Sequence, residues 1–171
     1  MLIYGILILT AFITGACACF FFRPYYFKLI LTLLLVTFLN EMIAAPLLHE
    51  EYSIRQNVAY NVFSLIDMSV WLFIFYKLNT GYKVQKSVLP VTVVIFVYTF
   101  VELFFLKGWE VLHSDSFRLY EIFIITLSII YLYRILKQEY YVISFDPFFW
   151  MCAACLLYHS ILILTFTSTQ N

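Results

Sequence analysis

The chain has 171 residues, of which 64% are hydrophobic and 12% charged, whereas an average soluble domain carries about a quarter charged residues. Hydrophobic residues run through nearly the whole chain, which excludes a separate soluble domain of ordinary size, since that needs roughly 50 residues. Ten basic and ten acidic residues balance, so the overall charge gives no indication of binding to nucleic acid or to a strongly acidic partner.

Apolar runs of about 20 residues, the length that crosses a hydrocarbon core of ~30 Å, predict six membrane spans. The predicted spans lie near residues 2–22, 29–48, 58–76, 88–106, 117–136 and 148–167. The loops between them are short and hold most of the charge, so neighbouring helices must run antiparallel. We therefore predict an all-α fold, a polytopic transmembrane helix bundle that forms a single domain over residues 1–171.

The first apolar segment ends in small residues, from Gly15 to Cys19, as cleavable signal peptides do. However, no basic residue precedes Leu2, and the apolar run is longer than that of a typical signal peptide. We expect this segment to remain as a span.

Lysine and arginine predict the orientation. One side of the predicted bundle carries seven of these residues: Arg23, Lys28, Lys77, Lys83, Lys86, Arg134 and Lys137. The other side has Arg55, Lys107 and Arg118. The positive-inside rule then places the side with seven basic residues in the cytoplasm, so both termini are expected on the outer side.

Proline positions suggest unbroken helices. Pro24, Pro90 and Pro147 are predicted at or just before helix starts, where a missing N–H is harmless, and Pro46 in the last turn of the second span. The unwound half-helices of many transporters are therefore not expected.

Four carboxylates lie in four different predicted spans: Glu41, Asp67, Glu102 and Glu121. At 1.5 Å per residue they come out about 6 to 14 Å inside the outer helix ends, and His159 near 12 Å. Ionisable groups inside a membrane are costly and often functional. We predict an acid-lined, ligand-binding pocket in the outer half of the bundle, formed by Glu41, Asn61, Asp67, Glu102, Glu121 and His159.

Helical spacing predicts which side chains support this pocket. Asn57, Asn61, Ser64 and Asp67 follow steps of four, three and three, which puts them on one face of the third span. The supporting residues are Asn40, Ser64 and Arg118, and an Arg118–Glu121 pair is expected because three residues separate them.

Each of these residues also has a purely structural interpretation. Glu102 and Glu121 are near enough to the interface to be wetted carboxylates at helix ends. Asn40 and Asn61 can serve as hydrogen-bonding partners between helices, and His159 as a satisfied core histidine.

The cysteines form a second possible constellation, Cys17 and Cys19 with Cys152 and Cys155. A CxxC spacing can indicate metal or redox chemistry. In a helix with neighbouring alanines, however, it favours packing, and no metal site or cofactor is predicted.

Enzyme signatures are missing from the chain. There is no HExxH, no GxSxG, no serine with a nearby histidine base and no phosphate-binding glycine loop. We expect no catalytic residues and a non-enzymatic protein.

Several segments carry a resemblance: Phe38-Leu39-Asn40-Glu41, Asn57-Val58-Ala59-Tyr60-Asn61 with Asp67, and Phe145-Asp146-Pro147-Phe148-Phe149-Trp150 with Tyr158. In these the chain resembles small multi-span inner-membrane proteins of Bacteroidetes bacteria. The resemblance implies a helix bundle, in that group usually with one helix more, and for some members a link with sensor-kinase systems. It also implies a multi-pass protein of the bacterial inner (cytoplasmic) membrane, and no catalytic residues can be carried over from it.

Together these features predict a receptor- or sensor-like membrane protein whose pocket binds a small cation, a basic ligand or protons. The expected partners are the lipid bilayer and a membrane signalling partner or further copies of the chain, without nucleic acid. One alternative is a small channel, permease or oligomeric pore for cations or protons. The other is a structural partner subunit of a membrane complex.

Overall fold

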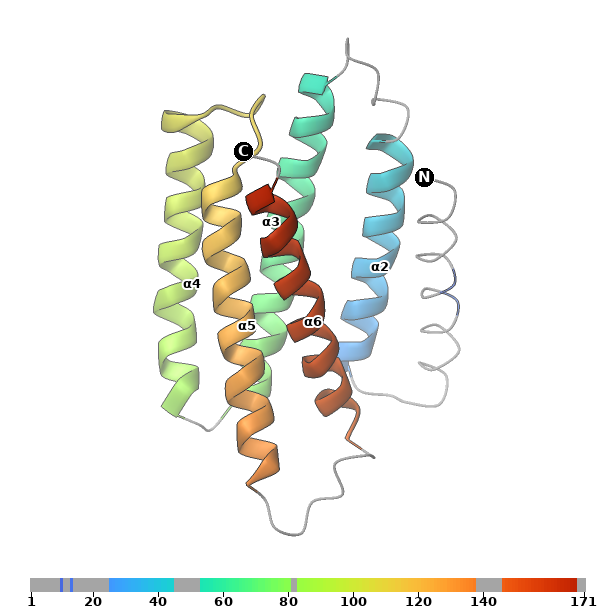
Figure 1. The fold of residues 1–171 in the computed structure, drawn as a ribbon, viewed down its shortest axis with the longest axis vertical. Helices are drawn as coiled ribbons and strands as arrows, with labels where there is room; N and C mark the ends of the chain where they lie inside the picture. Colours follow the sequence, from blue (N-terminus) through green and yellow to red (C-terminus); the bar gives the residue numbers. More distant parts are fainter. Residues whose placement is uncertain are drawn as a thin grey trace. The chain divides into compact units, whose positions relative to one another are not determined.

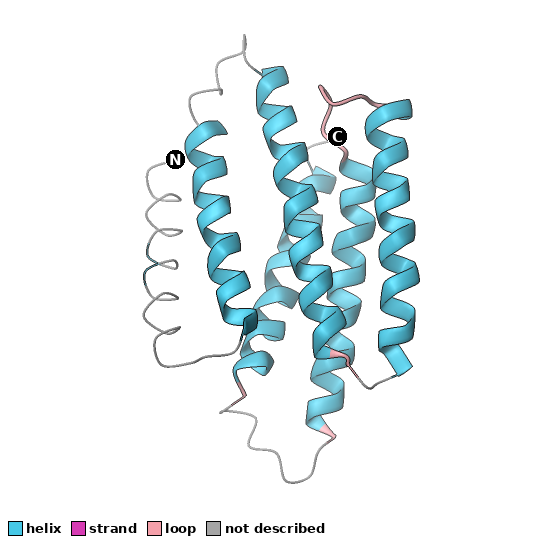
Figure 2. Ribbon diagram, turned by 180° about the vertical axis from the view of Figure 1, so that it is seen from behind, coloured by secondary structure: helices cyan, strands magenta, loops and turns pink. Residues whose placement is uncertain are grey.

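The computed structural model describes residues 10, 13, 25–44, 53–80, 83–137 and 146–168. The secondary structure of these residues is entirely helical and includes no strand, which confirms the all-α part of the predicted fold class (Figures 1 and 2). The helices are α2 (Tyr25–Ala44), α3 (Ser53–Leu78), α4 (Lys83–Val101), α5 (Ser114–Leu136) and α6 (Pro147–Ser168). A π-helix, Glu102–Leu106, continues α4.

Three of these helices are long and apolar enough to cross a membrane: Gln56–Leu78, Lys83–Leu106 and Ser114–Leu136. Two shorter apolar stretches are Lys28–Asn40 in α2 and Pro147–Ile163 in α6. Large apolar side chains on these helices point outward, among them Val94 with 66% and Phe105 with 76% of their surface exposed. Such surfaces suit lipid, so the helices indicate a membrane protein. The predicted first span, 2–22, lies outside the described residues except for Thr10 and Ile13.

Helix α4 begins five residues earlier than its predicted span, at Lys83 rather than residue 88. Pro90 therefore lies inside the helix, and the prediction that it lies at or just before the helix start was wrong. A search for apolar runs overlooks the polar first turn, Lys83 to Lys86, although a solvated turn of this kind is compatible with helix. Pro147, in contrast, begins α6 as predicted.

Asp146 stands directly before α6 and caps it. Its Oδ1 accepts a hydrogen bond of 2.8 Å from the Phe148 backbone N–H. With Pro147 in the first helical position, this is the usual chemistry of a helix start.

The chain divides into two compact units. The first comprises residues 1–74 and 103–113, and the second residues 75–102 and 114–171. In the second unit α5 packs against both α4 and α6 (Figure 1). The buried side chains of α5 recur every three or four residues, at Tyr120, Ile124, Leu127 and Tyr131, as expected for one continuous helix face.

Candidate functional site

A glutamate and a histidine face each other between α5 and α6. His159 Nδ1 lies 2.5 Å from Glu121 Oε2, and the two side chains are 0% and 1% exposed. The rings of Tyr120 and Tyr158 stand edge-on to the imidazole, with centroid distances of 5.9 and 5.2 Å. The structure thus brings together two of the six predicted pocket residues and seals them among aromatic side chains.

The short distance determines where one proton lies. Two unprotonated acceptor atoms would repel each other at 2.5 Å, so a proton lies between Nδ1 and Oε2. A carboxylate beside a neutral imidazole carries one net negative charge, and one further proton makes the pair neutral. Burial disfavours a net charge and therefore favours the uptake of this proton. The geometry is therefore that of a buried pair able to bind a proton.

The second carboxylate oxygen distinguishes this pair from a closed ion pair. Glu121 Oε1 is buried and has no hydrogen-bond partner among the described residues. The same holds for Ser128 Oγ, two turns further along the same face of α5. Buried polar atoms without a partner are uncommon, because each loses hydration without replacement.

Two thiols lie on the same face of α6 as His159, and we call the buried contact between α5 and α6 the seam. Cys152 and Cys155 are buried cysteines, spaced so that they share a face with His159. Among the described residues no group of three or more His, Cys, Asp or Glu side chains could hold a metal ion. Cys17 and Cys19 lie outside the part of the chain that the structure describes.

Glu102 has a structural role at the start of α5. Its Oε1 and Oε2 accept hydrogen bonds from the backbone N–H groups of Asp115 (3.2 Å) and Ser116 (2.8 Å). The first N–H groups of a helix have no partner within the helix, and a carboxylate there also matches the helix dipole. With 0% exposure and both oxygens engaged, Glu102 is a cap rather than a wetted rim residue.

Asn61 holds a loop. Its Nδ2 donates to the carbonyl oxygens of Trp109 (3.0 Å) and Val111 (2.9 Å), and its Oδ1 accepts from the backbone N–H of His113 (3.2 Å). One turn earlier, Asn57 Nδ2 donates to the Glu110 carbonyl at 2.8 Å. Two residues of the predicted polar stripe of α3, Asn57 and Asn61, thus bind the backbone of residues 109–113, and we name this contact the loop clasp.

The loop clasp contains a serine next to a histidine, which the sequence motifs did not reveal. Ser64 Oγ lies 2.8 Å from His113 Nε2, and His113 Nδ1 lies 2.7 Å from Asn61 Oδ1. The expectation that no serine has a nearby histidine base was therefore wrong. Ser64 and His113 are 49 residues apart in the chain, so no short motif reveals that they meet. The order Ser–His–Asn is that of a hydrolase relay.

Counting protons shows how this relay is arranged. Because the Asn61 amide nitrogen donates to two carbonyls, its oxygen faces His113, and Nδ1 must carry a proton. The single Ser64 hydroxyl proton has two acceptors, His113 Nε2 and the Asn61 carbonyl oxygen at 2.9 Å. All three side chains are buried and each one fastens the loop, so the bonds fully account for them as parts of the loop clasp.

The remaining predicted residues occupy different environments. Arg118 pairs with Asp115 at 3.6 Å, and not with Glu121 as predicted. Asp67 is only half-buried on α3. Asn40 is buried in α2, and its Nδ2 finds no partner in the described part of the chain. Glu41 belongs to α2, but its side chain lies outside what the structure describes.

Arg134 is a charged residue whose role was missed. Its Nη1 donates to Asn79 Oδ1 at 3.1 Å and its Nη2 to the Leu78 carbonyl at 3.3 Å. A cation is favourable there because the last carbonyls of α3 carry partial negative charge. A basic residue near a predicted interface was interpreted only as an orientation signal, since its partner lies 55 residues earlier.

Of the predicted pocket residues, Glu121 and His159 form one sealed pair, whereas Glu102 caps α5 and Asn61 belongs to the loop clasp. Neither a family model, nor a curated protein, nor a solved structure matches this chain.

Proposed function

We propose that this chain is a non-enzymatic, multi-span inner-membrane protein of receptor or sensor type. The element that responds is the Glu121–His159 pair, and its ligand is a proton or a small cation that can donate a hydrogen bond. The proposal also takes up the six predicted spans, the outward termini and the resemblance to inner-membrane proteins of Bacteroidetes.

One observation carries the proposal: Glu121 Oε1 is sealed inside the helix packing without a hydrogen-bond partner among the described residues, while Oε2 shares a proton with His159. A pair kept only for stability would be expected to satisfy both oxygens, because an unsatisfied buried acceptor costs about 1–3 kcal/mol. A buried polar atom that is left unsatisfied calls for an explanation, and a bound ion or a catalytic role is among the usual ones.

The mechanism follows from where the pair lies. Glu121 belongs to α5 and His159 to α6, so a change in their protonation alters the contact that joins these two helices. A proton or cation that binds one packing of α5 on α6 better than another shifts the population between them.

Other titratable groups lie on the helices α4, α5 and α6, and a test must distinguish their contribution to a pH response from that of the pair. Two tyrosines touch the imidazole, Arg118 is engaged by Asp115, and Glu102 is engaged by the backbone of α5. The groups concerned are Tyr120, Tyr158, Cys155, Arg118, Asp115, Glu102 and Tyr98.

The experiment uses protons as the probe. The full chain is reconstituted in liposomes, and its tryptophan fluorescence is followed from about pH 8 to about pH 5, the range in which histidine switches usually operate. We expect a transition in the wild type that is absent in Glu121→Gln and in His159→Gln. His49→Gln, which changes a histidine predicted to lie in a loop, serves as the matched control and should retain the transition.

The same liposomes separate the sensor from the channel. With a pH-sensitive dye trapped inside, the sensor should conduct no more protons than liposomes without protein. Proton flux that disappears in Glu121→Gln would support the channel alternative instead. A fluorescence transition that survives both Glu121→Gln and His159→Gln would refute the sensor proposal.

A further inference from the structure

Within the second unit, basic side chains lie at the end of α3, at the start of α4 and at the end of α5. Lys77 lies in the last turn of α3, Lys83 and Lys86 open α4, and Arg134 and Lys137 stand at the end of α5. We name these five residues the basic rim. The hydrogen bond between Arg134 and Asn79 joins the end of α5 to the end of α3, and residues 79–82 lead directly into α4.

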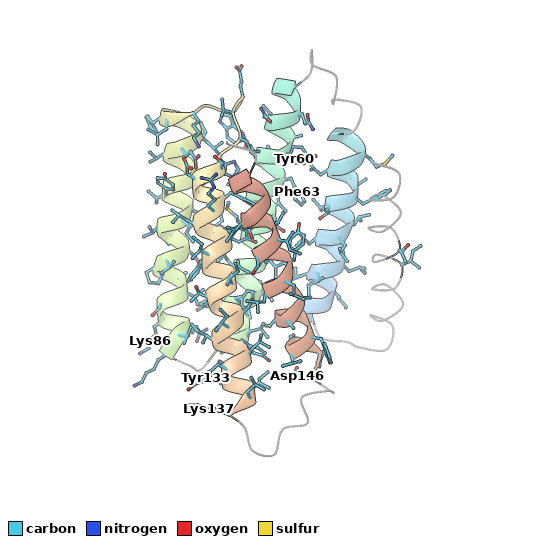
Figure 3. All side chains as sticks on the ribbon, in the orientation of Figure 1. Tyr60, Phe63, Lys86, Tyr133, Lys137 and Asp146 are labelled. Atoms are coloured by element: carbon cyan, nitrogen blue, oxygen red, sulfur yellow. The ribbon has the colours of Figure 1, made fainter. Side chains whose placement is uncertain are left out.

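The basic rim lies at a defined level of the helices. The apolar spans end at Leu78, begin at Lys83 and end at Leu136, and every rim residue is within three positions of one of these ends. At 1.5 Å per residue this is within about 5 Å of the span ends, where lipid headgroups begin. Figure 3 shows Lys86, Tyr133, Lys137 and Asp146 at this same end.

Tyrosine rings line the rim beside its cations. Lys137 Nζ lies 4.5 Å from the centroid of the Tyr133 ring, and Arg134 Cζ lies 4.8 Å from that of Tyr131. Tyrosine prefers the interface between hydrocarbon and water, and an aromatic face attracts a nearby cation. The rings therefore hold the cations at the level of the headgroups.

Among the residues that the structure describes at this end, the exposed charged side chains are all basic. Asp146 is the acid that the structure describes at this end, and it is 3% exposed and engaged as the α6 cap. At the opposite ends of α4 and α5, cations and acids alternate, as in the Arg118–Asp115 pair. The rim is thus complementary to a layer of anions and the opposite ends are not.

We propose that the basic rim binds the phosphate headgroups of anionic phospholipids in the leaflet on its side of the membrane. The exposed lysines supply point charges to the phosphates, and Arg134 fixes the ends of α3 and α5 beneath them. Each basic residue close to an anionic membrane surface strengthens such binding about fivefold. This inference does not depend on the proposed sensor function.

The test measures thermal unfolding of the full chain in nanodiscs of phosphatidylcholine with increasing fractions of phosphatidylglycerol. We expect the unfolding temperature to rise with the fraction of phosphatidylglycerol. This rise should be smaller at high salt, because salt screens exposed charges. The triple variant Lys83→Gln/Lys86→Gln/Lys137→Gln should lose this rise. Lys107→Gln, which removes a lysine beyond the other end of α4, should keep it.

Each result decides the question. A rise that the triple variant retains, or that Lys107→Gln loses equally, would show that the rim is not the binding surface. No rise with phosphatidylglycerol would also overturn the proposal. Inorganic phosphate is added to nanodiscs of pure phosphatidylcholine as a separate arm, and an equal rise there would identify free phosphate rather than lipid as the ligand.

Discussion

At the scale of single residues, charged and polar side chains inside the helices divide into two kinds. Glu102, Asn61 and Arg134 complete hydrogen bonds that helix ends and a loop leave open. Glu121 and His159 instead bind each other and leave one buried oxygen unsatisfied by the residues described. The hydrogen-bond partners of a side chain, rather than its depth in the membrane, separate structural from functional candidates.

The cap formed by Glu102 gives a first prediction. Glu102→Ala should lower the stability by about 1–2 kcal/mol, because two backbone N–H groups at the start of α5 lose a buried acceptor. Thermal unfolding in detergent measures the effect. Glu110→Gln, at an exposed position, is the control and should change the stability by less than about 0.5 kcal/mol. If Glu102→Ala is as mild as the control, the carboxylate is not an essential cap.

The loop clasp gives a second prediction. Asn61→Asp keeps an acceptor for His113 but removes the two N–H donors, so the carbonyls of Trp109 and Val111 would face a carboxylate. We expect a loss of about 2–4 kcal/mol and faster hydrogen exchange in residues 109–113. Asn57→Asp removes a single donor at an exposed contact and should have a smaller effect. Equal exchange in both variants would contradict the assignment.

A third prediction concerns the reactivity of Ser64. If the bonds of Ser64 and His113 only fasten the loop, a fluorophosphonate should label Ser64 no faster than Ser69, an exposed serine of the same helix whose hydroxyl donates to Leu65. Mass spectrometry of the labelled full chain locates the modified residue. Selective labelling of Ser64 that disappears in His113→Gln would instead indicate a working hydrolase relay and contradict the non-enzymatic proposal.

At the scale of elements, the sequence predicted that helices exist more reliably than it predicted where they begin. Each described helix overlaps one predicted span, because about 20 apolar residues suit both a membrane and a helix. The start of α4 was missed because its first turn, Lys83 to Lys86, is mostly polar. The π-helix after Val101 was missed because its apolar residues continue the pattern of α4 without a break. The facing of Asn57, Asn61 and Ser64 was correct, but the loop they bind could not be found from the spacing of one helix.

Candidate sites follow the same division. Glu121 and His159 were both selected by depth, but their pairing depends on the register of α5 against α6 across 38 residues of sequence. The expected Arg118–Glu121 pair came from local spacing alone, which favours neighbours on the same helix. Glu121 is buried and contacts His159 on the next helix. Arg118 instead pairs with Asp115, and both of these side chains are more exposed.

The seam between α5 and α6 gives a fourth prediction. Ser128 Oγ is buried without a partner in the described residues, so Ser128→Ala should leave the stability unchanged or raise it by up to about 1 kcal/mol. Ser116→Leu is a contrasting variant on the same helix, since a larger side chain at a fully buried position should overpack its surroundings and lower the stability. Thermal unfolding of both variants gives the comparison, and a clear loss in Ser128→Ala would mean that its hydroxyl is engaged.

At the scale of the whole molecule, stability and response should separate at the Glu121–His159 pair. Removing one partner strands the other, so Glu121→Leu or His159→Leu alone should lower the stability by about 3–5 kcal/mol. Replacing both by leucine removes two buried polar groups together and should restore most of that loss, because apolar side chains pack without desolvation cost. The double variant should nevertheless show no pH-dependent fluorescence transition in liposomes.

Thermal unfolding of the wild type, the two single variants and the double variant forms a complete cycle, in which the coupling energy measures the interaction between the two residues. If the double variant were as unstable as the sum of the single ones, the two residues would act independently, and a pair that binds a proton between α5 and α6 could not be the responsive element.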